Sequence, residues 1–146
     1  MRRLFCATIT ILLVLSTALS LGAECSSSFT TANISEATMA LSVDNDAKPL
    51  NPTNKFYEDT PVIYCSLKVS NAPVATDITS VWVYVRGELE LEDHEIDSFG
   101  MTVEGTTYVY FYMNRPTNNW PLGEYKLVFY LDGKEAESLP FTVQAR

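Results

Sequence analysis

The segment 120-WPLGEYKLVFYLDGK-134 decides the fold of this chain. From Tyr125 onward, large apolar side chains recur at every second position, which is the period of a β-strand. Because alternate residues of a strand point to opposite faces, we expect Leu127, Phe129 and Leu131 to fill a core. The Asp132-Gly133 pair that follows is a strong short-range signal for a hairpin. The segment therefore predicts two antiparallel strands of an all-β domain.

The period of two continues on the N-terminal side of this hairpin, and no helical period interrupts it. Turn-forming residues are frequent between the apolar runs, above all in the segments 44–54 and 71–73. The expected strands are Ala37–Val43, Val62–Ser70, Ile78–Arg86, Gly100–Glu104, Thr106–Met113, Gly123–Leu131 and Glu135–Gln144. About seven short strands with regular turns are typical of a single β-sandwich.

Residues 120–127, Asp132-Gly133-Lys134 and Phe141-Thr142-Val143 resemble the C-terminal half of immunoglobulin-like domains from secreted or envelope-anchored bacterial and archaeal proteins. The resemblance implies an immunoglobulin-like sandwich of about seven antiparallel strands from about Ser35 to Gln144. It places Tyr125 in a tyrosine corner and Trp82 in the core. Leu127 stands where antibody-type domains have their second cysteine, so the resemblance implies that Cys65 is a core residue or pairs with Cys25. It is nearly silent on function, because this architecture carries many activities.

The N-terminal 23 residues have the layout of a signal peptide. Arg2 and Arg3 precede an uncharged run from Leu4 to Leu21, and the small residues Gly22 and Ala23 follow it. An uncleaved membrane anchor is the alternative, because the run is about long enough to span a bilayer. Both interpretations place the domain outside the cytoplasm, as a secreted, periplasmic or cell-surface protein.

The charge of the chain excludes some partners. The net charge is −8, and removing a segment with two Arg and no acid makes it −10. Nucleic acid is an improbable partner, because phosphate binding requires a basic patch. Contact with a membrane is expected only through an N-terminal anchor or a lipid.

Cys25 and Cys65 remain once the signal segment, which holds Cys6, is removed. In an oxidising compartment they could form a disulfide. Cys25 could instead carry a lipid, although Glu24 stands where a lipoprotein has a small residue, and both thiols could stay free. Residues 24–35 are rich in Ser, Thr and Asn and predict a flexible tether, so that the domain itself covers residues 36–146.

The segment 88–97 contains six acids and the only histidine of the chain, His94. Carboxylates are ligands for calcium, but residues 88–92 alternate like a half-buried strand and no Asp-x-Asp-x-Asp-Gly loop is present. A solvated edge or a gatekeeping charge is therefore the favoured interpretation. A transition-metal site or a catalytic triad built on His94 would lack matching ligands or partners. We therefore expect no cofactor, no metal and no enzymatic activity.

Two surfaces are candidates for binding. Tyr108, Tyr110 and Tyr112 lie on one face of a single strand and could stack against a sugar ring, a small ligand or a peptide, or could simply stiffen the sheet. The second candidate arises because two strands are apolar on both sides, which predicts an outward patch if Trp82 and Leu127 point inward. Its residues are Val81, Val83, Val85, Val128 and Tyr130.

These observations predict a non-catalytic extracytoplasmic interaction or structural module. Its expected partner is a protein, either another copy of the chain or an envelope component. Carbohydrate or small-ligand binding through the tyrosine face is the first alternative. Inhibition of a protease through the loop 44–54 is the second, since sandwich domains can present inhibitory loops.

Overall fold

The computed structural model describes residues 30–146, and this part of the chain contains seven strands and no helix. Consequently it contains no helix that could span a membrane. In chain order the strands are β1 (Asn33–Val43), β2 (Pro49–Pro52), β3 (Lys55–Tyr57), β4 (Val62–Gly87), β5 (His94–Asn114), β6 (Gly123–Leu131) and β7 (Lys134–Gln144). The signal segment expected at residues 1–23 lies outside the described residues, as does most of the expected tether.

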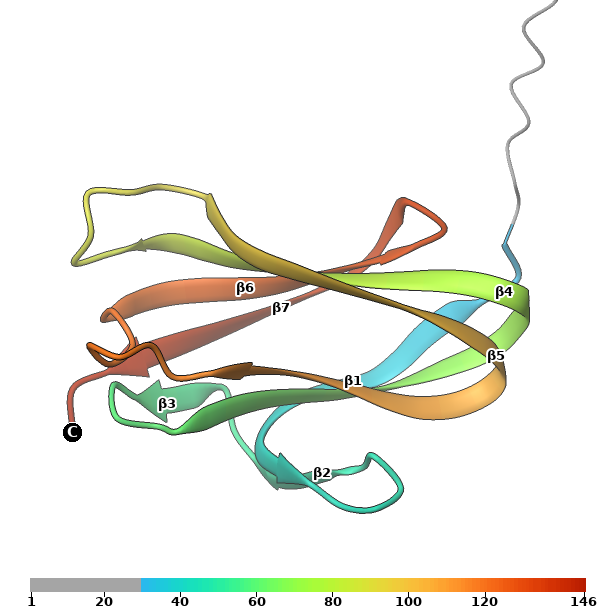
Figure 1. The fold of residues 1–146 in the computed structure, drawn as a ribbon, viewed down its shortest axis with the longest axis horizontal. Coiled ribbons are helices and arrows are strands. Elements are labelled where there is room, and N and C mark those ends of the chain that lie inside the picture. The colour runs from blue at the N-terminus through green and yellow to red at the C-terminus, as the bar shows by residue number, and fades with distance from the viewer. Residues whose placement is uncertain (1–29) are drawn as a thin grey trace, which may run out of the picture.

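The strands form one hydrogen-bonded sheet that bends into two layers (Figure 1). The bend occurs where β4 and β5, paired with each other, pass from one layer to the other. There Asn71, Ala75 and Gly105 have positive φ angles of 55°, 61° and 72°, and the pairing register shifts twice. Such irregularities increase the local twist of a strand pair. The first layer has the order β2-β1-β4-β5, and the second has the order β5-β4-β6-β7-β3.

The structure confirms the all-β, immunoglobulin-like class and corrects the strand boundaries. The turn expected at residues 71–73 bends β4 without ending it, so two expected strands are one strand of 26 residues. The strands expected at Gly100–Glu104 and Thr106–Met113 likewise merge into β5, which already begins at His94. The segment 44–54 contains β2, and β3 follows at Lys55 and pairs with β7 in parallel, not antiparallel. β1 begins at Asn33, three residues before the expected domain start.

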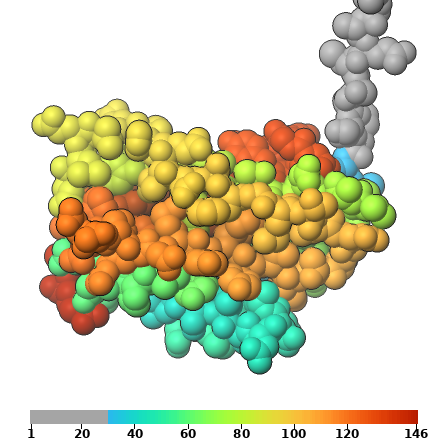
Figure 2. All heavy atoms as spheres, viewed as in Figure 1, coloured from blue at the N-terminus to red at the C-terminus, as the bar shows by residue number. Residues whose placement is uncertain are grey.

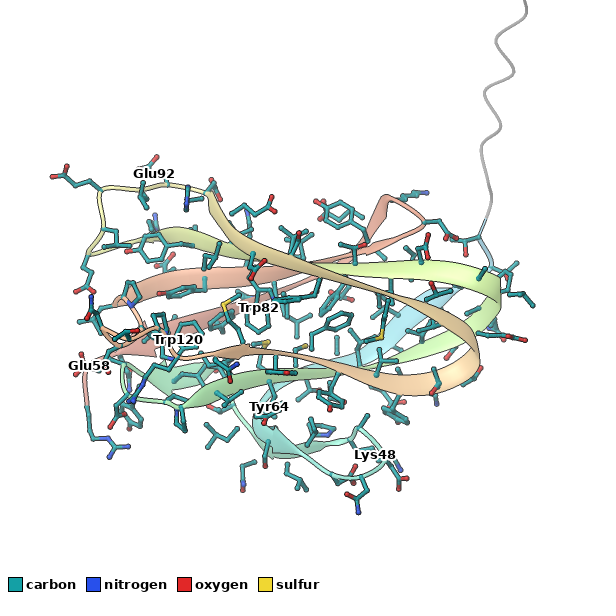
Figure 3. The ribbon with its side chains drawn as sticks, in the orientation of Figure 1. Lys48, Glu58, Tyr64, Trp82, Glu92 and Trp120 are labelled. Carbon is teal, nitrogen blue, oxygen red and sulfur yellow. The ribbon has the colours of Figure 1, made fainter. Side chains whose placement is uncertain are left out.

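The core lies between the two layers. Trp82, Leu127 and Phe129 are fully buried, and the ring of Phe129 lies 5.6 Å from that of Phe111 in the other layer. Trp82 is seen between the layers in Figure 3, with its ring 6.0 Å from Phe141. These positions confirm the inward orientation expected from the period of two.

The start of β6 and the residues just before it form the expected tyrosine corner. The hydroxyl of Tyr125 donates a hydrogen bond of 2.6 Å to the carbonyl oxygen of Pro121, and its ring stacks on Phe141 at 5.1 Å. Beside it, the indole of Trp120 donates to the carbonyl of Thr60 at 2.7 Å. These two rings therefore contribute apolar area while their polar atoms stay paired, whereas the buried indole N–H of Trp82 has no partner among the described residues.

Candidate binding site

β5 is an open edge of both layers. Every paired residue of β5 is matched to β4, and no other described strand pairs with it. Its residues cover most of the face seen in Figure 2, in yellow to orange. A strand with one partner presents a row of backbone N–H and C=O groups to solvent, so this edge can accept another strand.

A groove of about 510 Å³ follows this edge between the layers. Phe99 and Met101 form one wall, and the five consecutive residues 110–114 form the other. Phe99 and Met101 pair with Ser80 and Ile78, which are fully buried on the inner face of β4. Yet Phe99 is 41% and Met101 39% exposed, because no strand lies beyond β5 to cover them.

A second hollow of about 290 Å³ continues from the groove at Met113. Leu89, Leu91 and Ile96 line it and are exposed, and Trp120 and Tyr125 also contribute to its lining. The alternating segment 88–92 was expected to form a half-buried strand edge. Instead it is a loop, and Leu89 and Leu91 stand over this hollow.

The loop residues 88–93 and the start of β5 form an acidic rim, in which Asp97 lines the groove and the loop acids flank Leu89 and Leu91 at the second hollow. Its members are Glu88, Glu90, Glu92, Asp93, Glu95 and Asp97, and all are exposed. Within residues 30–146 only Asp93 of this set forms an ion pair, with the amine of Lys126 at 2.9 Å. Glu92 projects outward from the loop in Figure 3. The rim therefore presents negative charge that the described residues leave largely unneutralised.

Neither the rim nor His94 forms a metal centre in the described residues, where no three His, Cys, Asp or Glu side chains converge. Two of the carboxylates instead accept backbone hydrogen bonds: Glu88 from Leu122 at 2.9 Å and Asp97 from Ser98 at 2.8 Å. His94 is exposed and lines the second hollow. The preference for a solvated edge over a calcium site stays a prediction.

The tyrosine face divides into two parts. Tyr110 and Tyr112 are exposed and border the groove, and Tyr64 of the neighbouring strand lies 6.3 Å and 5.9 Å from their rings. Tyr108 is occupied by the protein itself, because its hydroxyl donates to Glu36 and the amines of Lys48 and Lys68 lie over its ring. That shared hydrogen bond raises the pKa of Tyr108 and lowers that of Glu36. The accessible ring cluster is thus Tyr64, Tyr110 and Tyr112.

The five residues of the predicted outward patch, here called the valine face, lie side by side on the outer side of the second layer, as their strand pattern requires. Val81 pairs with Val128, and Val83 pairs with Lys126. Val83 and Val128 are only 7% exposed, and Val81, Val85 and Tyr130 are half-buried. The ion pair from Lys126 to Asp93 draws the aliphatic stem of the lysine across this surface. The face is apolar, but its exposed area is smaller than the sequence pattern predicted.

The two remaining sequence candidates lie elsewhere. Cys65 is fully buried in the core, where burial raises its pKa to about 12, and it forms no disulfide within residues 30–146. Cys25 is outside the described residues, so its pairing or lipidation stays a prediction. The loop 44–54 folds back onto the first layer, where the hydroxyl of Ser66 donates to the carbonyl of Ala47 at 2.6 Å. Nothing in this geometry tests protease inhibition.

Sequence reasoning missed the residues that make the groove. Phe99, Met101 and Ile96 were not singled out, although Phe99 and Met101 have the spacing of one strand face. That spacing predicts which face of a strand is apolar, but it does not predict whether a neighbouring strand will cover the face. The acidic run beside them was the available signal for an edge.

Comparison with known proteins supports the fold alone. No protein-family model and no curated protein matches the chain. Among solved structures, an immunoglobulin-like protein from Pseudomonas aeruginosa has a TM-score of 0.53 at 13% identity, with 77% of this chain and 96% of that chain covered. The alkylpurine DNA glycosylase AlkC from Pseudomonas fluorescens, bound to DNA with an abasic site analog, has a TM-score of 0.50 at 12% identity.

The match to AlkC covers 78% of this chain but only 30% of the glycosylase. A beta-glucosidase from Listeria innocua is also similar, with a TM-score of 0.48 at 6% identity, and the match covers 79% of this chain and 16% of the enzyme. This chain therefore spans well under half of either enzyme. At 13% identity, the likeness to the Pseudomonas aeruginosa protein shows the immunoglobulin-like fold alone.

Proposed function

We propose that this chain is a non-catalytic protein-interaction module that acts outside the cytoplasm and contacts its partner at the β5 edge. The observation that carries the proposal is the gathering of exposed large apolar side chains along this one edge. They are Leu89, Leu91, Ile96, Phe99, Met101, Tyr110 and Tyr112. Contiguous exposed apolar surface rimmed by charge is typical of a protein contact site.

The proposed location follows from the basic and apolar N-terminal segment and from the resemblance to envelope proteins. Mass spectrometry of the mature protein tests it directly. We expect a chain that begins at Glu24, or at a lipidated Cys25, when the protein is recovered from outside the cytoplasm. A full-length, unmodified chain recovered from the cytoplasm would contradict the proposed location.

The contact surface is tested by affinity capture of the full chain from its own host. A Phe99→Asp/Met101→Asp variant should lose a partner that the wild-type protein retains, because it introduces two charges into the apolar groove. Leu50→Asp is the matched control, since Leu50 is a similarly exposed apolar residue on β2. Capture that is equal in all three proteins would overturn the proposed contact surface.

Carbohydrate binding is a second candidate, favoured by the accessible rings of Tyr64, Tyr110 and Tyr112. Ring faces of tyrosine can stack on the apolar face of a sugar. A glycan array probed with the full chain tests this candidate, with Tyr110→Ala as the variant that should lose binding. Tyr108→Ala is the matched control, because Tyr108 is already engaged by Glu36, Lys48 and Lys68.

A further inference from the structure

The groove wall formed by residues 110–114 follows a backbone edge and not a single side-chain face. Phe111 and Met113 belong to the inner face of β5, whereas Tyr110 and Tyr112 belong to the outer face, yet all four line the same groove. A groove bordered by consecutive residues of both faces runs along the edge of the strand itself. Within the described chain, the unpaired N–H and C=O groups of this edge therefore open into the groove.

We infer that the edge of β5 at residues 110–114 receives an extended, cationic segment of another protein as an added strand of the first layer. This inference rests on the proposed function and specifies the partner of the same surface. In strand addition, main-chain hydrogen bonds provide the affinity, and pockets for alternate side chains provide the specificity.

The geometry assigns the side chains of such a segment. In a strand added beside β5, every second side chain points into the groove, against Phe99, Met101 and Met113. The intervening side chains stand beside Tyr110 and Tyr112 on the outer face. Five residues of extended chain span about 17 Å, and the second hollow beyond Met113 accommodates further apolar contacts. An incoming segment of about eight residues would therefore fill both hollows.

The other half of β5 is a poorer acceptor. The carboxylate of Asp97 already accepts the N–H of Ser98 at 2.8 Å. A register shift between Trp82 and Val83 leaves Ile96 without a partner, so the strand is irregular at the same point. Bulges and inward-pointing charges are known protections of a strand edge. The regular register of residues 107–114 with β4 lacks both features.

The negative charge near the groove favours a positively charged segment. Asp97 lines the groove itself, and the acids of the loop 88–93 flank Leu89 and Leu91, which line the second hollow. Within residues 30–146 a single lysine pairs with this set, at Asp93. A second copy of this chain would bring the same acids to the contact, and like charges across an interface are unfavourable. In a segment that alternates apolar and basic residues, the apolar side chains can pack into the groove while the basic side chains lie near the acids.

The inference is tested with the full chain and a synthetic peptide probe. The probe is a capped peptide of about eight residues in which Val and Lys alternate. We expect binding with a Kd below about 1 mM, measured by fluorescence anisotropy. The matched peptide with Glu in place of Lys should not bind. Two further Val-Lys peptides are N-methylated, one at its Val residues and the other at its Lys residues. The peptide whose methyl groups fall on the edge-facing amides should bind at least about tenfold more weakly, because those amides no longer donate.

Protein variants separate the contributions of the groove and the rim. Phe99→Ala/Met101→Ala should weaken binding of the Val-Lys peptide about tenfold, and Leu50→Ala should leave this binding unchanged. Asp97→Asn should weaken binding and flatten its salt dependence, because Asp97 is the acid that lines the groove. Glu104→Gln/Glu135→Gln is the matched control, since both residues are exposed and outside the rim.

The outcomes distinguish this inference from the proposed function. Full binding of both N-methylated peptides, with loss in Phe99→Ala/Met101→Ala, would show a side-chain groove without strand addition and overturn the inference alone. Absence of binding by the Val-Lys peptide, while host capture still requires Phe99 and Met101, would reject a cationic segment. Host capture that is unchanged by substitution of Phe99 and Met101 would overturn the proposed function as well.

Discussion

β4 and β5 are the two longest strands, and they pair with each other through both layers, yet they have opposite roles. β4 has a strand on each side along most of its length, and even outward residues such as Val83 and Ser66 are buried. β5 has β4 on one side only, and inward residues such as Phe99 and Met101 are exposed. Whether a side chain is buried therefore depends more on whether its strand is central or at an edge than on which face of the sheet it points to. The central strand stabilises the fold, and the edge strand is the surface available for binding.

The sharpest test of this comparison uses a cross-strand pair. Ile78 of β4 and Met101 of β5 are direct partners on the same face, but Ile78 is fully buried. Ile78→Ala should lower the free energy of unfolding by about 3 kcal/mol, because it leaves a cavity in the core. Met101→Ala should lower it by less than about 1 kcal/mol. Urea unfolding measures both values, and equal losses would break the distinction between centre and edge.

At outward positions too, a substitution in β4 should lower the free energy of unfolding more than a substitution in β5. Val83→Glu should cost about 2 kcal/mol, because it buries a carboxylate directly opposite Glu95. The matched variant Ser98→Glu, on the exposed outer face of β5, should change stability by no more than about 0.5 kcal/mol. If Val83→Glu left the free energy of unfolding unchanged in urea, the valine face would be open to solvent.

The buried thiol of Cys65 on β4 predicts a loss of stability at alkaline pH. Burial raises its folded-state pKa from an ordinary value near 9 to about 12. Because the unfolded chain then releases its proton first, the contribution is fully present below about pH 9 and is lost as the pH rises toward 12. Between about pH 7 and pH 10, wild type should lose about 1.5 kcal/mol more than Cys65→Val does. Parallel pH profiles of the two proteins would contradict a buried, protonated thiol.

The smallest expected effect is on the outer face of β5. Tyr110→Ala removes ring contacts with Tyr64 and Tyr112, both at 6.3 Å, but buries no new polar group. The cost should be about 0.5 kcal/mol in urea unfolding. A loss similar to that of Ile78→Ala would mean that the tyrosine cluster stabilises the fold, which would weaken its candidacy as a binding surface.

Much of the fold could be predicted from local sequence. The alternation around Leu127 and Phe129, the Asp132-Gly133 turn and the spacing of Tyr125 from Pro121 all act within a few residues, and the structure confirms what they predict. The boundaries at residues 71–73 and 105 could not be predicted as bends. A turn signal shows that the chain changes direction there, but pairing between β4 and β5 keeps the strands continuous through the bend.

The candidate site was predictable only in part. Tyr110 and Tyr112 and the acidic segment were visible in the sequence, but their common groove depends on residues 97–101 lying across from residues 110–114. Tyr64 joins the tyrosine cluster through strand pairing, at a separation of more than forty residues along the chain. The valine face shows the opposite difference, because the neighbouring strands and Lys126 leave it less exposed than its strand pattern predicts. Its role as a partner contact stays a prediction.

The sequence by itself determined the strand content, the inward faces of β4 and β6, the hairpin at Asp132-Gly133 and the negative charge beside β5. These properties follow from side-chain alternation, local turn chemistry and composition, which require no knowledge of distant neighbours. Only the tertiary structure decided which strand lies at an edge and which apolar residues stay uncovered. That outcome depends on the pairing of strands far apart in the chain, and it makes the inward residues Phe99 and Met101 the wall of an open groove.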